Sequence, residues 1–166
     1  LQEGEELTVE TLLYGMLLES GNDAAYALAC HTAGDIDSFA QLMNEKACKI
    51  GCTNSSFANP HGLDDENHYS TARDMAMIMA KAMENDEFAE ISATKSITLQ
   101  GRTFVNHNKL LWNYDWTIGG KTGYTMSAGR TLVSCAEKDG LRLICVTIND
   151  RNDWEDHSLM YDCGFD

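Results

Sequence analysis

The sequence predicts an α+β fold, in which a helical part precedes an antiparallel sheet flanked by helices. Apolar residues recur at helical spacing through the first half of the 166 residues, and β-type segments gather after Ser92. The strongest strand candidates, 130–136 and 141–148, are joined by the tight-turn signal Lys138-Asp139-Gly140. Because a tight hairpin forces antiparallel pairing, this pattern favours α+β over a doubly wound parallel sheet.

The first two helices are predicted on either side of a short turn. Thr8 is a suitable N-cap for a helix over 9–19, whose apolar residues follow helical spacing. Ser20-Gly21 ends that helix, and Asn22 or Asp23 then caps an Ala-rich helix over 24–32. Ser20-Gly21-Asn22 is therefore expected in a tight turn that two buried helices hold from both sides.

Two further helices complete the helical part. One is expected over 36–50, stopped by Gly51, and a polar loop over 53–69 follows it. Thr71 and Asp74 resemble a capping box that opens a helix over 72–83.

The second half of the chain carries the strands and a closing helix. The turn Gln100-Gly101 separates two short strand candidates, and three longer strands come after them. The expected strands are 96–99, 103–105, 117–125, 130–136 and 141–148, and the closing helix is 153–163. We expect residues 1–166 to form one domain, helical over about 1–92 and sheet-forming over about 93–166.

Composition excludes several classes of partner. Hydrophobic residues make up 43% and charged residues 23% of the chain, which is typical of a globular protein. The net charge of −14 repels nucleic acid and anionic lipid. No apolar run approaches the ~20 residues of a membrane helix. The chain opens at Leu1-Gln2 without Met, so we expect that an N-terminal part of the protein is missing.

The 6 cysteines predict neither a metal site nor a redox motif, because no C-x-x-C and no zinc-like spacing occurs. Cys135 and Cys145 lie in apolar strands, where buried thiols behave as small hydrophobic side chains. We expect free, mostly buried thiols. Cysteine usage alone leans toward a reducing compartment.

The segment Gly119-Gly120-Lys121-Thr122-Gly123-Tyr124-Thr125 carries the chemistry, together with Ser20-Gly21-Asn22 upstream. Ser20 and Asn22 can flank a cleft from the helical side, and Lys121 and Thr122 from the sheet side. A lysine cation and a threonine hydroxyl can hold a substrate carboxylate. Gly123 leaves room for a substrate backbone against the strand, and the Tyr124 N–H can serve as an oxyanion donor.

A phosphate-binding loop is the rival interpretation of Gly120-Lys121-Thr122. That motif needs a glycine at position 115, where this chain has Asp115. It also needs a helix after the lysine, but β-type sequence follows Lys121. Nucleotide binding is therefore not expected.

Ser-x-Asn followed by Lys-Thr-Gly belongs to the active-site set of penicillin-recognising serine enzymes. The chain resembles the D-alanyl-D-alanine carboxypeptidase family, the low-molecular-mass penicillin-binding proteins, over essentially its whole length. The segments that carry the resemblance are 12–25, 39–44, 59–63, 69–74, 106–111, 120–125 and 164–165. The resemblance implies a β-lactamase/transpeptidase-like fold, incomplete here, in a partial penicillin-binding catalytic domain.

The resemblance also implies a reaction and its site residues. Such enzymes remove the terminal D-alanine from peptidoglycan stem peptides through an acyl-serine intermediate, which β-lactams trap. By resemblance, Ser20 relays protons, Asn22 holds the substrate amide, and Lys121, Thr122 and Gly123 receive the terminal carboxylate. Arg151 is a further candidate for that carboxylate, or else a solvated arginine at a strand end.

Partners and location are implied in the same way. The expected partners are stem peptides ending in D-Ala-D-Ala and β-lactams, without cofactor or metal. The expected place is the outer side of the cytoplasmic membrane, with any membrane contact made by a segment outside this chain. The cysteine content stands against that location, but we give the resemblance more weight.

Two departures from the family are expected to matter. The Ser-x-x-Lys segment that supplies the nucleophile and the base, carried by the family ahead of Leu1, is expected to be missing. Residues 1–166 alone should therefore be inactive. Tyr124 stands where some members of the family have histidine.

Two alternatives stay open at this point. A class A β-lactamase has the same architecture but typically shows Ser-Asp-Asn where this chain has Ser20-Gly21-Asn22. A non-catalytic homologue that binds cell-wall peptide is the other alternative, although Ser20, Asn22 and Lys121 are all present.

Overall fold

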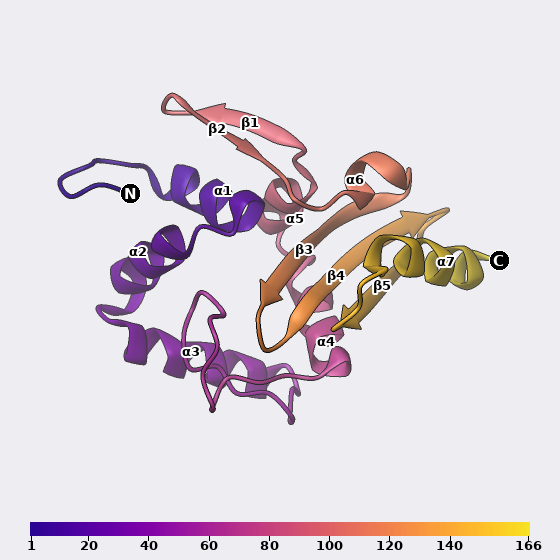
Figure 1. Ribbon diagram of the computed structural model, residues 1–166, viewed down its shortest axis with the longest axis horizontal. Helices are drawn as coiled ribbons and strands as arrows, with labels where there is room; N and C mark the ends of the chain where they lie inside the picture. The colour runs from indigo at the N-terminus through magenta and orange to yellow at the C-terminus, as the bar shows by residue number, and fades with distance from the viewer.

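The computed structural model describes residues 1–166 and places a run of helices ahead of two antiparallel sheets (Figure 1). The elements are α1 (Val9–Glu19), α2 (Asn22–Ala33), α3 (Ile36–Lys49), α4 (Ala72–Ala82), α5 (Asp86–Ala93), β1 (Ser96–Leu99), β2 (Arg102–Val105), α6 (Leu110–Asn113), β3 (Thr117–Thr125), β4 (Gly129–Lys138), β5 (Leu141–Ile148) and α7 (Asp153–Phe165). The α+β prediction is confirmed.

The main sheet has the order β3-β4-β5, and helices cover both of its faces. Successive residues of β4 point to opposite faces. Leu132 and Ala136 pack with Tyr161 of α7, whereas Val133 and Cys135 pack with Met79 and Met83 at α4. This two-sided burial explains why β4 is almost continuously apolar in sequence. It also leaves β3 at one edge of the sheet.

Strands β1 and β2 form a separate hairpin instead of joining the main sheet. Phe104 of β2 packs with Tyr14 and Leu18 of α1 and with Ile91 of α5. The hairpin is therefore part of the helical core, and the strands of the second half form two separate sheets. In Figure 1 it lies above α1 and α5.

Both predicted hairpin turns are tight two-residue turns with glycine at the second position. The β1–β2 turn has Gln100 at φ 46° and Gly101 at φ 75°, and the β4–β5 turn has Asp139 at φ 52° and Gly140 at φ 81°. Two consecutive positive φ values mark the type I′ turn, whose twist matches that of paired strands.

The helix caps agree with the sequence in part. Thr8 accepts a hydrogen bond from the Thr11 N–H at 3.1 Å, which confirms it as the N-cap of α1. The N-cap of α2 is Gly21, so the expectation of Asn22 or Asp23 was wrong by one or two positions. The Asp23 carboxylate instead accepts from the N–H of Ala24, inside the first turn.

The predicted capping box at α4 is only half made. Thr71 caps the Asp74 N–H at 3.1 Å, as expected. The fully buried Asp74 carboxylate turns away and accepts from the Asn54 N–H and the Ser55 hydroxyl, each at 2.8 Å. Asp74 therefore ties the polar loop after α3 to the start of α4.

Two helices were not predicted, and one of them supports the site. α6 has only four residues. α5 is capped by Asn85, which accepts from the Phe88 N–H at 2.8 Å, and it packs against β3. No helix in the structure is both long and apolar enough to cross a bilayer.

Candidate active site

The structure brings Ser20 and Lys121 into contact, although 101 positions separate them in the sequence. Ser20 ends α1 in the left-handed region, with φ 56° and ψ 38°. This conformation turns its side chain out of the helix and toward the sheet. The Lys121 ammonium reaches from β3 and donates to the Ser20 hydroxyl. A non-glycine residue at positive φ is uncommon, so the turn holds Ser20 in a costly conformation that serves this contact.

Lys121 is half-buried, and its ammonium makes a second hydrogen bond besides the one to Ser20. Its Nζ also donates to the Thr122 carbonyl oxygen at 2.8 Å. Burial lowers the pKa of the Lys121 ammonium from 10.5 to about 8. No carboxylate pairs with this lysine, so its charge is available for an anionic ligand.

Three glycines shape β3 around Lys121. A Cβ on Gly119 would lie 2.5 Å from the Ser92 hydroxyl oxygen, and one on Gly120 would lie 2.8 Å from the Val133 carbonyl oxygen. A Cβ on Gly123 would lie 2.5 Å from the Thr131 hydroxyl oxygen. These positions accept no side chain without local movement. The outer edge of β3 is unpaired, so its backbone groups can bind an added strand.

The side chains of the remaining predicted site residues make no hydrogen bond to Ser20 or Lys121. Asn22 is exposed in the first turn of α2, and Tyr124 is 69% exposed near the end of β3. Arg151 is exposed in the turn between β5 and α7 and makes no hydrogen bond or ion pair. Thr122 and Gly123 directly follow Lys121 on the edge strand.

The Ser-x-x-Lys spacing does occur once, at Ser92-Ala93-Thr94-Lys95, which corrects the expectation that the chain has no such segment. Its geometry does not fit a nucleophile. The Ser92 side chain is buried at the end of α5, where its hydroxyl donates to the Ala89 carbonyl at 3.2 Å. Lys95 follows the helix, is exposed, and lies over the Trp112 ring. Serine and lysine therefore point into different surroundings.

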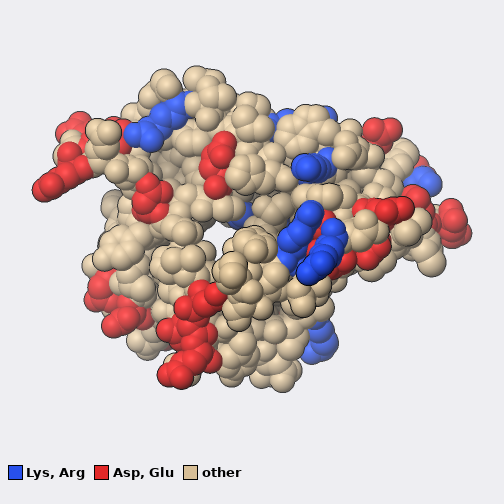
Figure 2. Space-filling model, viewed as in Figure 1, with Lys and Arg blue, Asp and Glu red and all other residues tan.

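The surface is hollowed between the helical part and the sheet. Figure 2 shows this hollow near the centre of the visible face, with basic side chains at its edge and acidic side chains over the helical part. Strand β3 borders the hollow in the matching view of the ribbon. An elongated substrate would thus meet helical turns on one side and an edge strand on the other.

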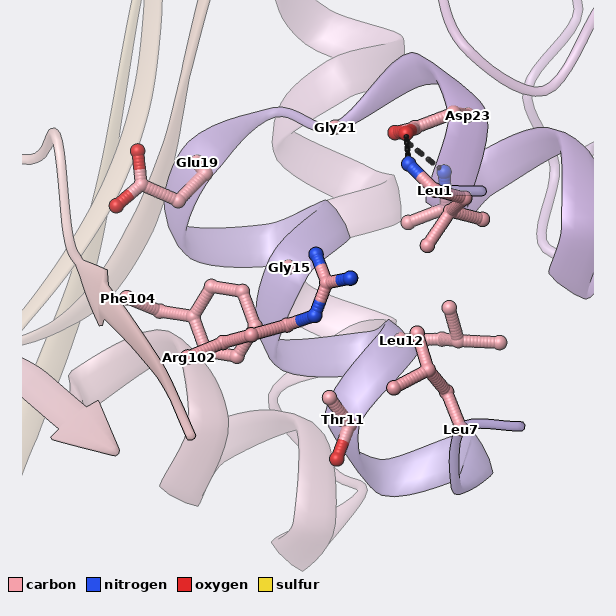
Figure 3. A pocket seen from close by; sticks show the side chains of 11 residues that line it. Leu1, Leu7, Thr11, Leu12, Gly15, Glu19, Gly21, Asp23, Arg102 and Phe104 are labelled. Atoms are coloured by element: carbon pink, nitrogen blue, oxygen red, sulfur yellow. Dashed lines mark hydrogen bonds and ion pairs between the residues drawn. The ribbon is translucent and has the colours of Figure 1, made fainter. Parts of the chain in front are cut away.

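A separate cavity of about 140 Å³ lies between α1, the start of α2 and β2 (Figure 3). Its lining includes Leu12, Gly15, Arg102 and Phe104, and it includes no residue of β3. It also includes Glu19 and Gly21, so the cavity borders the turn that carries Ser20 but does not reach Lys121. No group of three or more His, Cys, Asp or Glu side chains is arranged as a metal site.

Sequence reasoning missed the residues that support β3 from behind. Asn106 and Asn108 are 6% and 1% exposed, and they lie between β2 and the strand that carries Lys121. Their segment was noted only as part of the family resemblance. Two asparagines in a polar stretch predict a loop, whereas the structure shows that both side chains are buried.

Comparison with known proteins identifies the family. The family model described as D-alanyl-D-alanine carboxypeptidase (peptidase family S11) matches residues 1–152. The chain belongs to this family. DacC of Escherichia coli, a D-alanyl-D-alanine carboxypeptidase, is 41% identical over 157 residues, which cover 92% of this chain and 39% of that protein. DacF of Bacillus subtilis is 38% identical over 151 residues, covering 88% of this chain and 39% of that protein.

Solved structures agree with this assignment. The Streptomyces K15 DD-transpeptidase superimposes with a TM-score of 0.94 at 33% identity, covering 99% of this chain and 70% of that one. A D-alanyl-D-alanine carboxypeptidase from Mycobacterium tuberculosis gives a TM-score of 0.91 at 37% identity, covering 99% and 66%. The predicted transpeptidase-like fold is thereby confirmed. The chain spans about two fifths of the length of the first curated relatives, 39% in both cases.

Proposed function

We propose that the protein is a serine-type D-Ala-D-Ala carboxypeptidase that acts on peptidoglycan stem peptides and is inhibited by β-lactams. The contact between Ser20 and Lys121 carries this proposal, because it unites the two separated motifs in one site. Family membership favours a carboxypeptidase over a class A β-lactamase. The contact between Ser20 and Lys121 favours an enzyme over a binding homologue.

Lys121 is the electrostatic centre of the proposed site. Its unpaired cation would attract the terminal carboxylate of the peptide, and the Thr122 hydroxyl would donate to the same group. With a pKa of about 8, Lys121 is mainly protonated at neutral pH and can donate a proton to the Ser20 hydroxyl. Ser20 can then relay that proton to a leaving amine.

The other site residues would position the peptide along β3. Gly123 and the unpaired edge of the strand leave space for an extended backbone. Asn22 is placed on the helical side for the substrate amide, and the Tyr124 N–H is the proposed oxyanion donor. Arg151 is a second, more distant candidate for the carboxylate.

We further propose that the nucleophile and the general base come from chain outside residues 1–166. In the one Ser-x-x-Lys spacing within the chain, Ser92 is buried and Lys95 is exposed over the Trp112 ring, so the two do not form a nucleophile with its base. Acylation would join a serine oxygen to the carbonyl carbon of the penultimate D-Ala and release the terminal D-Ala as an amine. Water would then release the shortened peptide. Peptidoglycan lies outside the cytoplasmic membrane, so we place the protein there.

The test is release of D-alanine from a synthetic peptide ending in D-Ala-D-Ala, measured with the full-length protein. Removal of a preorganised electrostatic group costs about 10²- to 10³-fold in kcat. Lys121→Ala should therefore lose about that much activity, whereas Lys49→Ala, an exposed lysine on α3, should keep it. Equal activity of both variants would contradict the proposed role of Lys121.

A further inference from the structure

The segment Val105–Asn108, here called the strap, is bonded to the helix that ends at Ser20. The Val105 N–H donates to a Glu19 carboxylate oxygen at 2.7 Å, and the His107 N–H donates to the Leu18 carbonyl at 3.3 Å. The His107 ring lies 3.2 Å from the other Glu19 oxygen. Three contacts, made by Val105 and His107, thus fix the strap to the last turn of α1, directly before Ser20.

The same strap is bonded to the end of α5, which packs against β3. The Asn106 amide donates to the Ser92 and Thr94 carbonyls at 3.1 and 3.0 Å. The Asn106 N–H donates to the Lys95 carbonyl at 2.9 Å. These bonds satisfy the carbonyl groups that the end of α5 leaves free. The strap therefore joins the helix ends on both sides of the site.

Asn108 continues the strap to β3 itself. Its N–H donates to the Asn106 side chain at 2.9 Å, and its own Oδ1 accepts from the Leu110 N–H at 3.2 Å. These bonds orient the side chain, which is 1% exposed. Its Nδ2 has no hydrogen-bond partner and would lie 2.7 Å from a Cβ on Gly120.

Gly120 immediately precedes Lys121, and the Asn108 amide fills the space beside it. Gly119 is filled in the same way by the Ser92 hydroxyl. Both side chains thus occupy the space beside the strand just before the lysine that reaches Ser20.

We propose that the strap sets the position of Lys121 relative to Ser20, with Asn108 as a positioning residue that acts through Gly120. The proposal rests on the proposed function of the site. Misplacement by about 1 Å can cost about 10²-fold in rate, so a device that ties both sides to one segment has a direct catalytic use. A strap with a purely structural role would stabilise the fold without affecting the chemistry of the lysine.

The experiment compares Asn108→Ala and Asn106→Ala with the control Asn113→Ala in the full-length protein. Asn113 is an exposed asparagine on α6 without a side-chain hydrogen bond. Two quantities are measured: the rate of acylation by a fluorescent penicillin, and the pH dependence of Lys121 acetylation by acetic anhydride, followed by mass spectrometry. Where an asparagine variant does not fold, Glu19→Ala tests the contacts of the strap with α1 instead.

The proposal predicts that Asn108→Ala slows acylation about 10- to 100-fold and moves the acetylation midpoint of Lys121 upward, while the control changes neither. Combined with Lys121→Ala, Asn108→Ala should add little further loss, because both act on one group. If Asn108→Ala and Asn106→Ala fold and keep the wild-type acylation rate and the wild-type pH midpoint of Lys121 acetylation, the proposed role of the strap is wrong. Wild-type protein without acylation would refute the proposed function instead, and the acetylation midpoint would still test the strap.

Discussion

Lys121→Met should stabilise the folded protein at neutral pH, although it removes a residue of the proposed site. Burial lowers the pKa of the Lys121 ammonium from 10.5 to about 8. At 1.36 kcal/mol per pH unit, this difference corresponds to a penalty of about 3 kcal/mol for the charged amine. The two lost hydrogen bonds, to the Ser20 hydroxyl and the Thr122 carbonyl, offset about 2 kcal/mol of this penalty. The expected net gain at pH 7 is therefore ~1 kcal/mol.

The pH dependence of this gain has a definite sign. Below pH 8 the lysine is protonated in both the folded and the unfolded protein, so the wild type bears the full penalty. Between pH 8 and 10.5 the unfolded chain binds more protons than the folded protein, and wild-type stability rises. The advantage of Lys121→Met should shrink through this window and end as a loss of about 2 kcal/mol, because both hydrogen bonds of Lys121 are missing.

Urea unfolding of both proteins at pH 7 and across the alkaline window measures this difference, and other titrating groups cancel in the comparison. Lys49→Met is the matched control, because the Lys49 side chain is 74% exposed. Its stability should stay within about 0.5 kcal/mol of the wild type. The reasoning is refuted if Lys121→Met is less stable than the wild type at pH 7 by an amount that does not vary with pH.

Two further predictions concern the rest of the chain. His157 is fully buried between the Ser134 and Thr147 hydroxyls, and burial lowers its pKa from 6.5 to about 4. Acidification from pH 6.5 to 4 should therefore lower the free energy of unfolding of the wild type by about 3 kcal/mol, a loss that His157→Gln should not show. Urea unfolding across this pH range measures the difference. Parallel curves of unfolding free energy against pH would contradict the prediction. A native thiol titration should modify the exposed cysteines first and spare the buried ones until denaturant is added, and uniform reactivity would argue against the fold. The exposed cysteines are Cys48 and Cys163, and the buried ones are Cys52, Cys135 and Cys145.

The sequence predicted those parts of the fold that local chemistry determines. In the turns Gln100-Gly101 and Asp139-Gly140, the glycine supplies a positive φ at no steric cost, and Asp139 tolerates one better than most residues do. The apolar run of β4 predicted a strand, and both of its faces are in fact buried. The placement of β1 and β2 outside the main sheet depends on Phe104 reaching the core of α1, which is a long-range contact. No local pattern reports such a contact.

The candidate site could be predicted to a similar extent. The order and chemistry of Ser20-Gly21-Asn22 and Lys121-Thr122-Gly123 were sufficient to expect that they meet, and Ser20 and Lys121 do. The roles of Asn22, Tyr124 and Arg151 stay predictions, as does the single partial domain. The buried supports Asn106 and Asn108 could not be predicted, because burial of a polar side chain depends on the elements that pack around it.

The most direct test of the central claim is labelling of the full-length protein with a fluorescent penicillin, followed by peptide mapping of the adduct. We expect one adduct on a serine outside residues 1–166, strongly reduced labelling of Lys121→Ala, and no labelling of purified residues 1–166. An adduct on Ser20, or stable labelling of residues 1–166 alone, would contradict the proposal that this chain forms one side of the site and receives its nucleophile from elsewhere.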